Sequence, residues 1–103
     1  MYKQRGENNL FPNTINTWVR GDKVPEWLSD IAKVNFIDAE GNKYLEMSDI
    51  SAGGYEIKES SGVNALVRAS GRDSIICFGD GKIFSLTPKQ LSILYEEISP
   101  KSL

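Results

Sequence analysis

Short runs of residues between regularly recurring turn signals constrain the fold of this chain more than any other sequence feature. Glycine-containing or strongly polar turn segments occur at 20–23, 39–42, 53–54, 60–62, 70–73 and 79–81. Most runs between them alternate apolar with polar side chains, which is typical of half-buried β-strands. Strands that recur at a spacing of roughly 8–12 residues predict an antiparallel sheet or a small barrel rather than parallel βαβ units.

Seven runs predict β-strands: residues 14–19, 34–38, 43–47, 55–59, 63–69, 74–78 and 82–86. The last six are expected to form three hairpin-like pairs, because a short turn separates the two members of each pair. The run 74–78 is apolar at consecutive positions from Ile75 to Phe78. It is therefore apolar on both faces, which predicts a central strand covered on both sides.

The C-terminal part of the chain predicts an amphipathic helix with a defined start. Thr87 and Gln90 have the spacing of a capping box, with Pro88 at the first helical position. One apolar face follows at helical spacing and consists of Leu91, Leu94, Tyr95 and Ile98. The Ser-Pro pair at 99–100 is expected to end this helix.

A second, shorter helix is expected to begin at Pro25. Its apolar stripe consists of Val24, Leu28, Ile31 and Ala32. The predicted fold is α+β, mainly an antiparallel or small barrel-like sheet of about six to seven strands. The short helix lies near the N-terminus, and the C-terminal amphipathic helix packs on the sheet. Residues 1–9 are expected to form a flexible N-terminal tail, and residues 10–103 a single α+β domain.

The chain of 103 residues has no histidine and a single cysteine, Cys77. The lack of histidine excludes Ser-His-Asp catalysis, Cys-His catalysis and histidine-containing zinc sites within the chain. One cysteine cannot form a disulfide or an all-thiolate zinc site on its own. Carboxylate pairs such as Glu96 with Glu97, or Asp38 with Glu40, could in principle act as a glycosidase-type dyad. The first pair is expected on an exposed helix face and the second in a turn, where carboxylates are usually only solvated. We therefore expect no enzyme activity, no cofactor and no metal.

The charge balance and the apolar pattern narrow the expected partners and compartment. The sequence has 12 basic and 14 acidic side chains, a formal net charge of -2, which provides no overall field toward nucleic acid or an anionic membrane. No stretch approaches the roughly 20 apolar residues of a membrane span, and no secretory leader is recognisable. A lone cysteine fits a reducing compartment. We expect a cytoplasmic protein with no membrane partner, and a nucleic-acid partner is not expected.

Two small features of the sequence are expected to be structural. Cys77 lies in the most apolar run, where a thiol is inert because no positive charge or helix N-terminus lowers its pKa. The segment 79–81 resembles a fragment of a cation loop or phosphate loop, but it leads into a strand and lacks the further ligands that such loops need. It is interpreted as a hairpin turn.

Cationic and aromatic side chains provide the candidate binding site. A guanidinium group beside an aromatic face can bind a phosphate while the ring stacks on a base. The candidate residues are Arg68, Arg72, Lys82, Trp18 and Tyr55, and the same group of aromatic side chains includes Trp27, Tyr44 and Phe78. Arg68 interrupts an apolar strand, and Arg72 follows in the next turn. The alternative interpretation is that these aromatic residues belong to the core and the cations to its rim.

Two functions follow from these observations. The first is a small non-enzymatic binding protein that inhibits a host macromolecule, a protein above all, by occupying its surface. The short, turn-rich chain without a catalytic motif resembles the accessory proteins of phages and mobile elements, many of which act in this way. The alternative is a protein that binds or sequesters an anionic small molecule, such as a nucleotide, in an arginine and aromatic pocket. A homo-oligomer would suit both functions, because small domains often protect a sheet edge by sharing it.

Overall fold

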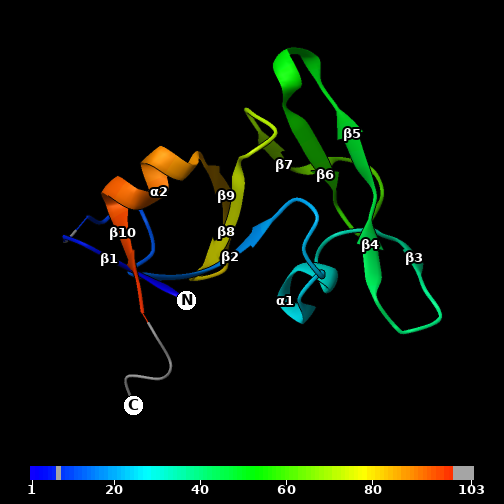
Figure 1. Ribbon diagram of the computed structural model, residues 1–103, viewed down its shortest axis with the longest axis horizontal. Coiled ribbons are helices and arrows are strands. Elements are labelled where there is room, and N and C mark those ends of the chain that lie inside the picture. The colour runs from blue at the N-terminus through cyan, green and yellow to red at the C-terminus, as the bar shows by residue number, and fades with distance from the viewer. Residues whose placement is uncertain (7, 99–103) are drawn as a thin grey trace.

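The computed structural model describes residues 1–6 and 8–98, and Figure 1 shows how its elements are arranged. These residues form ten β-strands, two short α-helices and one 3-10 turn. All strand pairs are antiparallel, so the prediction of a mainly antiparallel α+β fold is confirmed. The prediction of one sheet or barrel of about six to seven strands is wrong, because the described residues form ten strands that divide into three sheets.

The largest sheet contains five strands in the order β10-β1-β2-β8-β9. Their bounds are β1 (Tyr2–Gln4), β2 (Thr14–Val19), β8 (Ile75–Gly79), β9 (Lys82–Leu86) and β10 (Tyr95–Glu97). Helix α2 (Pro88–Leu94) packs on one face of this sheet, as the left half of Figure 1 shows.

The two smaller sheets lie on the other side of the molecule (Figure 1). The three-stranded sheet contains β5 (Met47–Asp49), β6 (Tyr55–Lys58) and β7 (Ala65–Ala69), with the 3-10 turn η1 (Ser51–Gly53) before β6. The two-stranded sheet is a hairpin of β3 (Val34–Ile37) and β4 (Lys43–Leu45), and it follows the short helix α1 (Glu26–Ser29). The three predicted hairpin pairs are all present, as β3–β4, β6–β7 and β8–β9.

The predicted strand 43–47 is divided between two sheets at Glu46. The Glu46 amide donates to the Lys33 carbonyl at 3.0 Å, and the Glu46 carbonyl accepts from the Lys58 amide at 3.4 Å. Glu46 therefore pairs with a different neighbour on each side, and the chain passes from the hairpin into the three-stranded sheet. An uninterrupted alternating pattern does not reveal such a transfer.

Strand β8 is covered on both faces, as predicted. The register pairs Trp18 with Ile76 and Thr17 with Cys77, so neighbouring residues of β8 point to opposite sides of the sheet. On one side lies the central cluster, whose buried members are Trp18, Leu28, Ala32, Leu45, Tyr55, Ile57, Val67, Ala69 and Ile76. On the other side lies the helix cluster, whose buried members are Ile15, Ile75, Cys77, Leu86, Leu91 and Tyr95.

The C-terminal helix begins as predicted but ends earlier. The Thr87 hydroxyl accepts from the Gln90 amide at 3.1 Å, and the Thr87 amide donates to the Gln90 side chain at 2.9 Å, which completes the capping box. The helix stops at Leu94, and Tyr95 begins the edge strand β10. The buried Tyr95 hydroxyl donates to the Pro12 carbonyl at 2.7 Å, and β1 satisfies the backbone of β10. Residues 99–100, expected to end the helix, lie outside the described residues.

The prediction of a flexible tail over residues 1–9 is wrong at residues 2–4, which form strand β1 between β10 and β2. Gln4 is buried, and its side-chain amide donates to the carbonyls of Asn8 (2.9 Å) and Phe11 (2.8 Å). It also accepts from the Asn8 amide at 3.0 Å. Burial of a fully hydrogen-bonded polar side chain leaves no apolar pattern in the sequence, so this strand was missed.

Helix α1 is the short helix expected near the N-terminus, and it is a single turn. Pro25 is its N-cap with an extended backbone rather than its first helical residue. Leu28 and Ala32 are buried in the central cluster, and Val24 and Ile31 pack against it. Because so short a helix is unstable alone, this packing on the sheets stabilises it.

Candidate functional site

Two of the candidate residues, Trp18 and Tyr55, belong to the central cluster. Trp18 is 4% exposed, and its indole N–H donates to the Asp22 carbonyl at 3.1 Å. Tyr55 is fully buried, and its hydroxyl donates to the Ser74 carbonyl at 2.9 Å. Burial raises the pKa of the Tyr55 hydroxyl, so this group stays a neutral hydrogen-bond donor. Tyr55 therefore offers no free ring face to a ligand. This agrees with the alternative interpretation, in which the aromatic residues belong to the core.

The cation that contacts Tyr55 is Arg20, which the sequence did not single out. Its guanidinium lies 5.2 Å from the centre of the Tyr55 ring and pairs with the Asp49 carboxylate at 2.9 Å. Arg20 directly follows β2, and Asp49 lies opposite Tyr55 in the register of β5 and β6. This contact therefore joins the five-stranded sheet to the three-stranded sheet.

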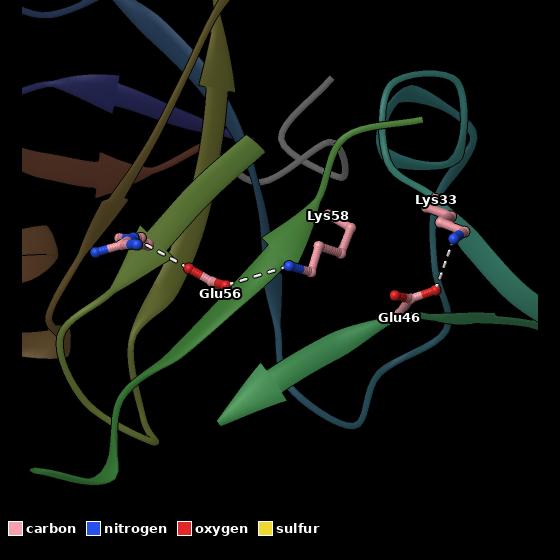
Figure 2. Close-up of polar contacts among 5 residues, drawn as sticks. Lys33, Glu46, Glu56 and Lys58 are labelled. Atoms are coloured by element: carbon pink, nitrogen blue, oxygen red, sulfur yellow. Dashed lines mark hydrogen bonds and ion pairs between the residues drawn. The ribbon is translucent and has the colours of Figure 1, made fainter. Parts of the chain in front are cut away.

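The three candidate cations lie apart from these rings. Arg68, on β7, pairs with Glu56 on β6 at 3.0 Å, and Lys58 reaches the same carboxylate at 3.4 Å. Figure 2 shows Glu56 and Lys58 side by side on β6. Arg72 lies in the exposed turn before β8, and Lys82 begins β9 beyond the far end of β8. The structure therefore does not gather the five candidate residues into one pocket.

The β3–β4 hairpin carries an apolar surface of which only Tyr44 is among the aromatic candidates from the sequence. Phe36 is 54% exposed, Ile37 59% and Tyr44 43%. Phe36 and Tyr44 are register partners, and their rings stack with centroids 4.4 Å apart and planes 14° from parallel. A signal was present in the sequence: apolar residues at 36 and 37 are adjacent, and an isolated two-stranded hairpin cannot bury both of its faces.

Hydrogen bonds at Asp38 fix the tip of this hairpin. The Asp38 carboxylate accepts from the backbone amides of Glu40 and Asn42, both at 2.9 Å, and from the Asn42 side chain at 3.1 Å. It also accepts from the Tyr44 hydroxyl at 3.2 Å. The hydrogen bond from the Asn42 backbone amide is the main cause of the lowered pKa of Asp38, so this carboxylate is ionised at neutral pH. The same contact with Asp38 raises the pKa of Tyr44 and holds its ring in place.

A small apolar hollow lies beside Tyr44. Its volume is about 110 Å³, and it is lined by Trp18, Gly21, Asp22, Val24, Lys43, Tyr44, Leu45 and Met47. The Lys43 ammonium donates to the Ser29 hydroxyl at 3.2 Å, which ties β4 to α1 at the rim of the hollow. We call Phe36 and Tyr44 together with this hollow the hairpin surface, and Ile37, the next residue of β3, points to the opposite face of the hairpin.

Three depressions of the described structure are larger than this hollow. Two of them, of about 290 and 420 Å³, are lined mainly by polar residues. The third, of about 220 Å³, lies between the N-terminal loop and α2, where Gln4, Phe11 and Ile93 are among its lining residues. Both neighbours of residue 7, which lies outside the described residues, line this depression, and no binding site is assigned there. Within residues 1–6 and 8–98, no group of three or more Cys, Asp or Glu side chains is placed to hold a metal ion.

Comparison of the chain with protein-family models, with curated proteins and with solved structures finds no match. Among the residues that the structure describes, no helix is long and apolar enough to cross a membrane. The hairpin surface and its surroundings therefore remain the candidate site.

Proposed function

We propose that this protein is a non-enzymatic binding protein that covers the surface of a partner protein, and that the hairpin surface makes the contact. The observation that carries the proposal is the exposed stack of Phe36 on Tyr44, with a hollow next to Tyr44. Exposed apolar patches rimmed by polar residues mark interaction sites in small proteins. Aromatic side chains next to a pocket are typical of the residues that dominate binding energy.

The rigidity of the hairpin supports the same function. Asp38 fixes the turn, and the Tyr44 ring is held between Phe36 and that carboxylate. An ordered aromatic surface loses little conformational entropy on binding, so more of the contact energy appears as affinity. A protein that binds in this way can inhibit its partner by excluding other molecules from the covered surface.

The edges of the sheets also favour the hairpin as the contact. Strand β10 is an outer strand of the five-stranded sheet, and its exposed residues are Glu96 and Glu97, whose charges discourage pairing with another chain. Strand β3 is an outer strand of the hairpin, and its exposed residues are Asn35, Phe36 and Ile37, which are uncharged. We place the protein in the cytoplasm, because its single cysteine is buried and unpaired.

Photo-crosslinking in the source cells tests this function. A photoreactive phenylalanine analogue replaces Phe36 in one variant and Ile93 in a matched control, since Ile93 is equally apolar and exposed (60%) but lies on α2. We expect one discrete crosslinked protein from position 36, lost when Tyr44→Ser is added, and none from position 93. Circular dichroism checks that both variants are folded. Equal crosslinking from the two positions, or none from position 36, would contradict the proposal.

A further inference from the structure

The segment that carries the hairpin surface is more acidic than the rest of the chain. Residues 22–46 contain six acidic side chains, Asp22, Glu26, Asp30, Asp38, Glu40 and Glu46, and three lysines, Lys23, Lys33 and Lys43. This difference leaves the segment with a formal charge of -3, whereas the whole chain carries -2. The acidic excess is therefore concentrated on α1, β3, β4 and their turns.

Contacts within the segment occupy two of its three lysines. Lys33 pairs with Glu46 at 3.1 Å, as Figure 2 shows, and Lys43 donates to the Ser29 hydroxyl. Glu40 is exposed at the hairpin tip, and within the described residues its carboxylate forms no ion pair. The hollow itself is lined by one acid, Asp22, and one cation, Lys43, so the acidic excess that a partner meets comes from the segment 22–46 as a whole.

The hollow is suited to one aliphatic side chain. Its floor includes Trp18, Val24 and Leu45, which are apolar, and Tyr44 forms part of its wall. A dry cavity of roughly 150 Å³ is known to take up a benzene molecule, so 110 Å³ fits a group of the size of a leucine side chain. An apolar anchor that enters such a pocket is the usual centre of a protein interface.

We infer that the partner presents an aliphatic side chain flanked by lysine or arginine, that this side chain enters the hollow, and that the cations pair with exposed carboxylates of the segment 22–46, such as Asp22 at the hollow and Glu40 at the hairpin tip. The inference rests on the proposed function, because it concerns the same surface. Charge complementarity argues for this occupant over a second copy of the chain. Two copies that met through this surface would bring two segments of charge -3 together, which costs energy.

Titration of the ¹⁵N-labelled protein with defined peptides tests the inference. The probe is acetyl-Lys-Arg-Leu-Arg-Lys-amide, and the controls carry serine in place of leucine or glutamate in place of every cation. The Trp18 indole N–H is the reporter, because Trp18 lines the hollow. We expect saturable shifts at Trp18, Leu45 and Met47 with the basic leucine peptide, about tenfold weaker binding of each control, and weaker binding at high salt.

Two variants with a matched control locate the binding. Glu40→Lys reverses the charge at the hairpin tip without removing a side-chain hydrogen bond of the described structure, and Tyr44→Ser removes the wall of the hollow. Each is expected to weaken binding of the basic leucine peptide about tenfold. Ile93→Ser removes an equally exposed apolar side chain on α2 and is expected to leave the affinity unchanged. The dispersion of the amide resonances shows whether each variant is folded.

Three outcomes would overturn the inference. The acidic peptide binds as tightly as the basic one, or no peptide shifts the Trp18 reporter, or the same resonances shift with protein concentration alone, which identifies a second copy as the occupant. If the peptides fail while crosslinking from position 36 succeeds, the inference fails and the proposed function stands. If both experiments fail, the proposed function fails with it.

Discussion

Cys77 illustrates how one buried side chain sets a property of the whole protein. The thiol lies in the helix cluster with no exposed surface, and burial raises its pKa from the ordinary 9.0 to about 12. At neutral pH the thiolate is therefore scarce, and the sulfur behaves as a small apolar group. The buried, structural position that the sequence predicted for Cys77 is confirmed.

The raised pKa of Cys77 predicts a loss of stability in alkaline solution. Between pH 9 and about 12 the unfolded chain releases the thiol proton while the folded chain keeps it, so the free energy of unfolding falls as pH rises. The fall is at most about 1.4 kcal/mol per pH unit for one proton. Cys77→Ala should make this fall smaller, and the fall that remains comes from the four tyrosines, whose pKa values are raised in the folded chain above the ordinary value of 10.0. Urea denaturation at a series of pH values measures the slope, and equal slopes for both proteins would refute the explanation.

At the scale of single elements, α2 shows why an apolar repeat leaves the end of a helix undecided. Tyr95 fits the helical spacing from Leu91, yet it is equally buried as the first residue of β10. A strand at this point pairs with β1, and a longer helix would leave that edge of β1 without a partner. The backbone hydrogen bonds of a distant segment therefore decide where α2 ends.

Two alanine substitutions on α2 separate its buried face from its exposed face. Leu91 is 7% exposed in the helix cluster, and Ile93 is 60% exposed two residues away. Leu91→Ala is expected to lower the free energy of unfolding by roughly 2–5 kcal/mol, because it leaves a cavity in a packed cluster. Ile93→Ala should change it by less than about 0.5 kcal/mol. Urea denaturation measures both, and similar losses would show that α2 does not pack through Leu91.

At the scale of the whole molecule, β8 joins the two clusters. Ile76 points into the central cluster and Cys77 into the helix cluster, although the two residues are neighbours in the chain. Loss of β8 would expose both clusters together. The shared strand therefore argues for one cooperative unit.

The location of the tryptophans makes this cooperativity measurable. Trp18 belongs to the central cluster and Trp27 packs against it, so tryptophan fluorescence reports on that side of the sheet. If the protein unfolds in one step, Leu91→Ala in the helix cluster should lower the denaturation midpoint by fluorescence as much as by circular dichroism. A fluorescence midpoint that does not move, while the circular dichroism midpoint falls, would show two independent units.

The sequence alone determined the features that depend on neighbours in the chain. Turn residues between alternating runs predicted the three hairpins, Thr87 and Gln90 predicted the capping box, and the apolar run from Ile75 predicted the doubly covered strand. Each of these depends on spacing within one or two elements, where side-chain direction follows directly from position. Such features can be read before any long-range contact is known.

The tertiary structure alone decided which aromatic residues are free to bind. Trp18 and Tyr55 are buried because the three-stranded sheet and α1 pack over β2 and β8, whereas Phe36 and Tyr44 are exposed because no described element covers their rings. The pairing of β1 with β10, which joins residues 2–4 to residues 95–97, is likewise absent from any local pattern. Burial of a side chain depends on segments far away in the sequence, and the pattern of one segment carries no information about them.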